Sequence, residues 1–162
     1  MRSRSPSGVR RRGRWRVGDV AAVPFGNGRE GYGWVLTFPL VAFLEVSSRG
    51  EEDRPDISRI VGAPVAFRIW VMRRALTARV WPIIGSASPP PEILEEPWFF
   101  KRDRIARTLS IYRRGIEVAA DRKACQGLEC AAVWDPEHVA DRLRDHFDGR
   151  PNEWVESLRL KD

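Results

Sequence analysis

The chain has 162 residues and a mass of 18.6 kDa; 43% of its residues are hydrophobic and 31% are charged. A chain of this length and composition buries a core of its own, which excludes a disordered protein or a fibre, and it is too short for a multidomain enzyme. The formal net charge is +6, but residues 1–16 supply seven arginines and no acidic residue, so the remainder is close to neutral. The basic charge that usually indicates nucleic acid or an anionic membrane therefore belongs to the N-terminal segment.

Residues 1–14 consist mainly of Arg, Ser, Pro and Gly and predict a disordered basic tail. The composition leaves open whether this tail is a functional arm or an upstream extension of the reading frame. We expect residues 15–162 to form a single domain. No stretch reaches the roughly 20 apolar residues of a membrane helix, and no apolar run of signal-peptide length follows the basic start. We therefore expect no contact with a membrane.

Alternating apolar residues predict strands in the first half of the chain. The predicted strands are residues 20–25, 32–38, 41–46, 65–71 and 77–84. A turn at Gly26-Asn27-Gly28 separates the first two strands, and residues 47–59 form a polar, exposed loop. Residues 86–97 contain four prolines and predict a surface connection or an inserted binding loop.

The second half predicts a hairpin and a helix. Residues 109–118 flank the turn Arg113-Arg114-Gly115, and residues 131–134 form a last short strand. A helix then begins at Asp135, a capping residue followed by Pro136, and ends at Gly149; a shorter helical piece starts at Pro151. The chain is therefore predicted to be α+β, with a mainly antiparallel β-sheet or open barrel and one or two C-terminal helices.

Residues Gly26 to Gly31 match the pattern G-x-G-x-x-G of dinucleotide-binding proteins. That fingerprint requires a helix directly after the glycines, because the helix N-terminus holds the pyrophosphate. Here the following residues, 32–38, alternate as a strand does. We therefore interpret the glycines as a turn between antiparallel strands, with positive φ angles that glycine adopts without strain.

Groups that could catalyse a reaction or bind a metal are sparse. His138 and His146 are eight residues apart on the predicted helix, whereas helical metal ligands usually lie four apart. Cys125 and Cys130 could form a hairpin disulfide, but without a secretory signal two reduced thiols are expected. We expect no catalytic residue, no metal and no cofactor.

One segment near the start and one later element resemble a known family. Residues 15–25 (WRVGDVAAVPF), followed by Gly28, residues 31–33 (GYG) and residues 34–36 (WVL), resemble the opening of the immunity protein 26 family. Proteins of this family begin with a G-D-V-F-A-I-P-L type strand, a glycine turn and a G-Y-G-R-V type strand. Residues 81–85 (WPIIG) resemble the later W-x-x-I-G element. The resemblance spans about residues 15–100, and it departs from the family at Ala21 and Trp34, where an aromatic and a basic residue are frequent.

This resemblance implies a cytoplasmic bacterial protein that binds and neutralises a cognate polymorphic toxin. Aromatic and charged residues on loops are frequent in protein interfaces, so we predict a toxin-binding set from loop residues. The set is Asn27, Arg29, Glu30, Glu51, Glu52, Asp53 and Trp98. Two other classes stay open: a nucleic-acid-binding β-barrel module that uses the arginine-rich tail, and a small enzyme that uses His138 or His146.

Overall fold

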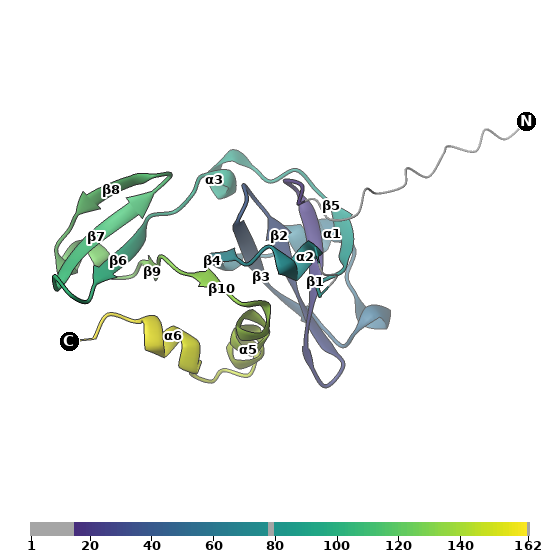
Figure 1. The fold of residues 1–162 in the computed structure, drawn as a ribbon. Coiled ribbons are helices and arrows are strands. Elements are labelled where there is room, and N and C mark those ends of the chain that lie inside the picture. Colours follow the sequence, from purple (N-terminus) through teal and green to yellow (C-terminus); the bar gives the residue numbers. More distant parts are fainter. Residues whose placement is uncertain (1–14, 78–79, 162) are drawn as a thin grey trace, which may run out of the picture.

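The computed structural model describes residues 15–77 and 80–161, and these residues form an α+β fold with two mixed sheets (Figure 1). The strands are β1 (Asp19–Gly26), β2 (Arg29–Val35), β3 (Leu40–Ser48), β4 (Val65–Val71), β5 (Ile83–Ser86), β6 (Phe99–Asp103), β7 (Thr108–Arg113), β8 (Ile116–Ala119), β9 (Glu129–Cys130) and β10 (Val133–Trp134). The helices are η1 (Glu51–Asp53), α1 (Ile57–Gly62), α2 (Arg74–Thr77), α3 (Pro91–Leu94), α4 (Arg122–Cys125), α5 (Pro136–Phe147) and α6 (Glu153–Leu158).

The first sheet has the order β10-β4-β3-β2-β1-β5 and is covered on both faces. On one face α5 packs through Leu143 against a cluster that contains Phe43 and Trp81. On the other face Tyr32 and Leu36 pack with residues of α1 and with the start of β6. Because both sets of alternating side chains are apolar, β1, β2 and the first five residues of β3 are buried almost throughout.

The second sheet has the order β8-β7-β6-β9 and contacts the first through aromatic side chains. The Trp70 ring of β4 lies 4.4 Å from the Phe99 ring of β6 and 5.5 Å from the Tyr112 ring of β7. The indole N–H of Trp70 donates to Glu96 at 2.9 Å, so the segment before β6 is held at the same contact. The outer strand β8 is exposed along its whole length.

A single stretch of chain joins the two sheets. β9 pairs in parallel with β6 in the second sheet, and β10 pairs in parallel with β4 in the first sheet. Arg142 of α5 adds an ion pair to Glu129 of β9 while its guanidinium lies 3.7 Å from the centre of the Phe67 ring. The two sheets are thus connected by backbone pairing and by a side chain that contacts both.

Most of the predicted elements are confirmed. The strands at 20–25, 32–38, 41–46 and 65–71 correspond to β1 to β4, the hairpin to β7 and β8, and the strand at 131–134 to β10. The helix begins as predicted, because the Asp135 side chain accepts from the backbone N–H of Glu137 and Pro136 takes the first position. Gly149 follows the helix with a φ of 67°, and the shorter helix is α6.

The predicted strand at 77–84 is wrong. Residues 74–77 form α2, residues 78–79 lie outside the described ranges, and β5 begins only at Ile83. The backbone N–H of Trp81 donates to the carbonyl of Ala75 at 2.9 Å, and Pro82 has no N–H to pair in a ladder. Trp81 is therefore a buried anchor after a helical turn, although its spacing is that of a strand residue.

Candidate partner-binding surfaces

The turn between β1 and β2 and the segment around η1 adjoin at one end of the first sheet. Asn27 has a φ of 54° within the β1–β2 turn. A Cβ on Gly50, which precedes η1, would lie 3.1 Å from the carbonyl oxygen of Gly28. This end, which we call the turn end, therefore brings together six of the seven predicted toxin-binding residues: Asn27, Arg29, Glu30, Glu51, Glu52 and Asp53.

Glu30 differs from the other residues of the turn end because its side chain is inside the molecule. The residue is only 7% exposed, and its carboxylate accepts from Arg54 at 2.7 Å and from the Tyr32 hydroxyl at 3.0 Å. Burial raises the pKa of Tyr32. Glu30 thus anchors the segment after η1 through Arg54, and its carboxylate is not presented at the surface.

Arg29 links the turn end to the end of α5. Its guanidinium forms an ion pair with Asp148 at 2.8 Å and lies 4.8 Å from the centre of the Phe25 ring. This contact holds the pKa of Asp148 below its usual range. The acidic residues of η1 are all exposed. The turn end therefore presents the negative charges of η1 on a backbone that the ion pairs of Arg29 and Glu30 hold in place.

Trp98 lies apart from the turn end. It lies between α3 and β6 and directly precedes β6 in the second sheet. The guanidinium of Arg113 from β7 covers the half-buried ring at 4.6 Å, and Arg113 also pairs with Glu95 at 3.1 Å. The structure does not bring Trp98 together with the other predicted residues.

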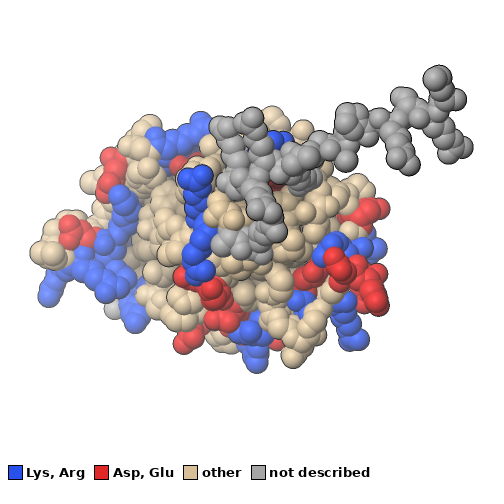
Figure 2. Space-filling model, turned by 45° about the vertical axis from the view of Figure 1, so that its right-hand side comes forward, with Lys and Arg blue, Asp and Glu red and all other residues tan. Residues whose placement is uncertain are grey.

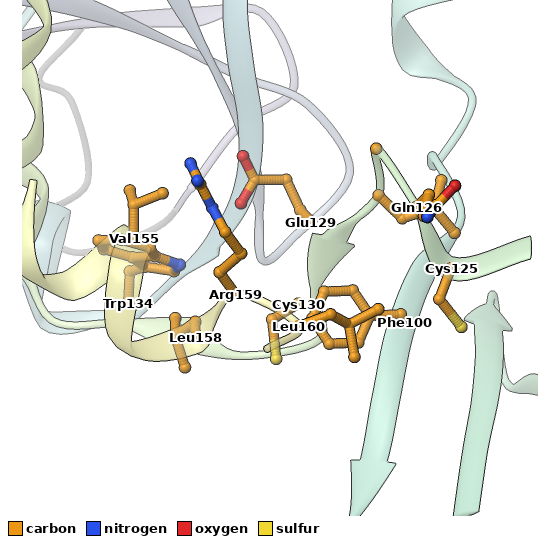
Figure 3. Close-up of a pocket in the computed structure, with 12 residues that line it drawn as sticks. Phe100, Cys125, Gln126, Glu129, Cys130, Trp134, Val155, Leu158, Arg159 and Leu160 are labelled. Atoms are coloured by element: carbon orange, nitrogen blue, oxygen red, sulfur yellow. The ribbon is translucent and has the colours of Figure 1, made fainter. Parts of the chain in front are cut away.

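A groove that the sequence did not predict runs between the second sheet, α4 and α6. Its apolar section has a volume of about 440 Å³, and side chains from β6, α4, β9, β10 and α6 surround it (Figure 3). Its basic section has a volume of about 510 Å³. Leu160 lines both sections, so they adjoin. We call the two sections together the C-terminal groove.

The basic section is lined by five cationic side chains and one acidic one: Arg102, Arg104, Arg107, Arg122, Lys161 and Asp103. Figure 2 shows that basic side chains predominate at the left-hand end of the molecule, where the second sheet lies in Figure 1. The Asp103 carboxylate accepts from the backbone N–H groups of Ile105 and Ala106, both at 2.9 Å, and these bonds lower its pKa. Asp103 thus fixes the turn that carries two of the arginines.

The two cysteines line the apolar section as free thiols. Burial raises the pKa of both Cys125 and Cys130, so the less reactive thiol form predominates at neutral pH. Within the described ranges, no group of three or more His, Cys, Asp or Glu side chains is placed to hold a metal ion. Every helix there is too short or too polar to cross a lipid bilayer.

The two histidines lie at separate contacts. The His138 ring stacks on Trp154 of α6 with centroids 3.6 Å apart. The Nε2 atom of His146 lies 2.7 Å from a carboxylate oxygen of Glu45 on β3. Both contacts fasten α5 to a neighbouring element, and the structure does not bring the two rings to a common site.

The sequence does not predict the C-terminal groove, because the residues that line it come from elements far apart in the chain. Arginines at 102, 104 and 107 are typical of a solvated turn when they are read in sequence alone. The sequence does hold one sign of a basic surface, which is the charge of a whole region. Residues 99–130 contain eight basic and four acidic residues, whereas the rest of the chain after residue 16 has a net negative charge.

The comparisons with known proteins agree with the first half of the fold. The family model described as immunity protein 26 matches residues 16–110, a segment that runs from just before β1 into β7. It covers more than half of the chain, including the turn end and most of the first sheet. No curated protein and no solved structure matches the chain.

Proposed function

The chain belongs to the immunity protein 26 family, and on that premise we propose that it neutralises a cognate bacterial polymorphic toxin by forming a stoichiometric complex with it. The protein works in the cytoplasm of the cell that makes it, where the toxin would otherwise act. Residues 15–162 bind as one unit and transform no substrate. The family match over residues 16–110 is the observation that carries this proposal.

The geometry supports a binding role. Neutralisation requires a stiff surface and an interface of roughly 1,200–2,000 Å² rather than a catalytic group. The first sheet is covered on both faces, and the ion pairs of Glu30 and Arg29 hold the turn end in place. Stiffness of this kind reduces the entropy that binding costs. The turn end, including Asn27 and the exposed acids of η1, is therefore our first candidate surface.

The test uses the toxin domain encoded by the gene next to this one. Co-expression of the full chain should restore growth of cells that produce the toxin, and the purified pair should elute as a 1:1 complex by light scattering. A triple variant, Glu51→Lys, Glu52→Lys and Asp53→Lys, should weaken the complex. Failure of the full chain to bind or protect against any neighbouring toxin would refute the proposal.

Two matched controls separate this proposal from the alternatives. Replacing both His138 and His146 with glutamine should leave protection unchanged, whereas an enzyme that uses either ring would lose it. Deleting residues 1–14, which lie outside the described residues, should also leave protection unchanged. A nucleic-acid-binding function through that arginine-rich tail would instead show a salt-sensitive DNA affinity that the deletion abolishes.

A further inference from the structure

We propose that the C-terminal groove binds an extended acidic segment of the partner protein, with carboxylates in the basic section and apolar side chains in the apolar section. This inference rests on the proposed function, because it supplies a second contact with the same toxin. The groove lies outside the turn end, so it adds a separate surface to that interface.

The first argument is shape. The two sections share Leu160 and together run from the β6–β7 turn to the contact between β10 and α6. Phe100, Leu128 and Leu158 give the apolar section a hydrophobic lining. Glu129 and Arg159 also line this section. A ligand that fills both sections must therefore be elongated, with charged groups toward the arginines and mainly apolar groups toward Phe100 and Leu158.

The second argument is charge. Arg102, Arg104 and Arg107 form no ion pair with any residue in the described ranges. Elsewhere many arginines have a carboxylate partner, as Arg29 and Arg142 do. Asp103, whose carboxylate is the one that lines the basic section among residues 15–77 and 80–161, already accepts two backbone N–H groups. These three arginines therefore present positive charge without a carboxylate partner among the described residues, which attracts and orients carboxylates of a partner.

The third argument is an unpaired donor. Trp134 is 4% exposed, and among the described residues its indole Nε1 has no hydrogen-bond acceptor. Trp134 lines the apolar section, and Figure 3 shows its nitrogen turned toward the side where Arg159 lies. Buried indole N–H groups are normally paired, because an unsatisfied donor costs about 1–3 kcal/mol. A carbonyl or carboxylate of a bound segment would satisfy this donor.

The same observations favour a protein segment over a nucleic acid. Single-stranded nucleic acids bind where exposed aromatic faces stack on bases. The aromatic rings of the groove offer no such face, since Phe100 is 3% exposed and Trp134 is 4% exposed. The apolar section instead suits aliphatic side chains, which a nucleic acid lacks.

The direct test measures binding of a fluorescein-labelled peptide of alternating glutamate and leucine to the full chain. We expect saturable binding that weakens as salt is added. The peptide with glutamine in place of each glutamate should bind at least about tenfold more weakly, because it lacks the charges that the arginines attract. Equal binding of the two peptides would overturn the proposal.

Charge-reversal variants place the binding in the groove. The double variant Arg104→Glu and Arg107→Glu should weaken peptide binding at least about tenfold. The matched control, Arg59→Glu and Arg73→Glu, changes the net charge equally at exposed residues outside the groove and should have little effect. Equal losses in the two double variants would show binding to overall charge and would refute the groove site.

A spectroscopic readout follows the unpaired donor itself. The indole ¹⁵N–¹H signal of Trp134, assigned with the Trp134→Phe variant, should shift downfield when the acidic peptide binds. An unchanged signal at saturating peptide would contradict the proposal. The shift itself is recorded on the unaltered chain, and the variant serves only to assign the signal.

The same variants distinguish this inference from the proposed function. If the Arg104→Glu and Arg107→Glu variant binds the neighbouring toxin as tightly as the unaltered chain, the groove proposal fails and the proposed function stands. If the unaltered chain binds the acidic peptide but no toxin, the proposed function fails. If a single-stranded DNA oligonucleotide displaces the peptide at equal concentration, the groove is a nucleic-acid site and our inference is wrong.

Discussion

The two sheets of this molecule differ in how much of each is covered. Strands β1 to β3 of the first sheet are buried on both faces, whereas β8 of the second sheet is exposed, with Ile116 60% and Val118 48% accessible to solvent. The family match covers most of the first sheet and ends within β7 of the second. The comparison indicates that the first sheet supplies the buried core of the fold, whereas the second sheet supplies solvent-exposed strand surface.

A pair of glutamates shows the same difference in chemical detail. Glu30 in the first sheet bonds a cation, Arg54, and a hydroxyl, Tyr32, and it is almost completely buried. Glu117 in the second sheet also bonds a cation, Lys101, and a hydroxyl, Ser110, but it is exposed. The arrangement is equivalent, so a difference in stability between the two pairs comes from burial.

The largest difference is expected from truncating an apolar side chain. Phe43→Ala removes a fully buried ring whose centroid lies 5.1 Å from that of Phe67, and it should lower the free energy of unfolding by about 3–5 kcal/mol. Ile116→Ala in β8 should change the free energy of unfolding by less than about 0.5 kcal/mol. Urea unfolding followed by circular dichroism measures both. Similar losses would show that the second sheet is as tightly packed as the first.

The next difference concerns two glycines with positive φ. A Cβ on Gly18 would lie 2.6 Å from the carbonyl oxygen of Ala87, whereas a Cβ on Gly115, in the β7–β8 turn, would meet no atom within 4 Å. Both have positive φ angles, 95° and 80°, so alanine introduces backbone strain at each. Gly18→Ala should therefore cost about 1–3 kcal/mol more than Gly115→Ala in the same unfolding assay. Equal losses of stability in the two variants would mean that the backbone at Ala87 moves aside to accommodate the added Cβ, and would contradict this prediction.

A smaller effect separates the two glutamates. Glu30→Gln removes the charge from a buried ion pair and should lower the free energy of unfolding by about 1–2 kcal/mol. The matched variant Glu117→Gln should lower it by less, because water screens that pair. A loss at Glu117 as large as the loss at Glu30 would contradict the role that we assign to burial.

The smallest effect appears only in alkali. Because burial raises the pKa of Tyr32 above its ordinary value of 10.0, the unfolded chain releases this proton at a lower pH than the folded chain. The unfolded state then binds fewer protons, so the free energy of unfolding falls as the pH rises through this range. Between about pH 9 and about pH 11 the unaltered protein should lose more stability than the Tyr32→Phe variant. Parallel curves for the two proteins would refute this assignment.

Local signals were sufficient for the elements that depend on few neighbours. The β1–β2 hairpin follows from alternation around Gly26 and Gly28, and α5 follows from Asp135, Pro136 and one apolar stripe. β6 gave no such signal, because Lys101 is held by tertiary contacts, an ion pair with Glu117 and a position over the Tyr112 ring, which its charge does not indicate in the sequence. The spacing of Trp81 predicts a strand residue, because the sequence carries no sign of its backbone bond to the carbonyl of Ala75.

The candidate surfaces were predictable only in part. Asn27 and Glu51 belong to turns that the neighbouring glycines and charged residues predict from the sequence. The structure places these two turns together at one end of the first sheet. Glu30 has the composition of a surface residue, but Arg54, 24 positions later, determines its burial. The C-terminal groove depends on contacts between β6, α4 and α6, which no local pattern encodes.

The short stretch that contains β9 and β10 limits how the molecule can come apart. β9 pairs with β6 in the second sheet, and β10 pairs with β4 in the first sheet. The two sheets therefore cannot separate without breaking the hydrogen bonds of one of these two pairings. We therefore expect amide protons in β6 and β4 to exchange with deuterium together, in a single cooperative opening. A protease cut between these two short strands would abolish that coupling and allow each sheet to exchange at its own rate.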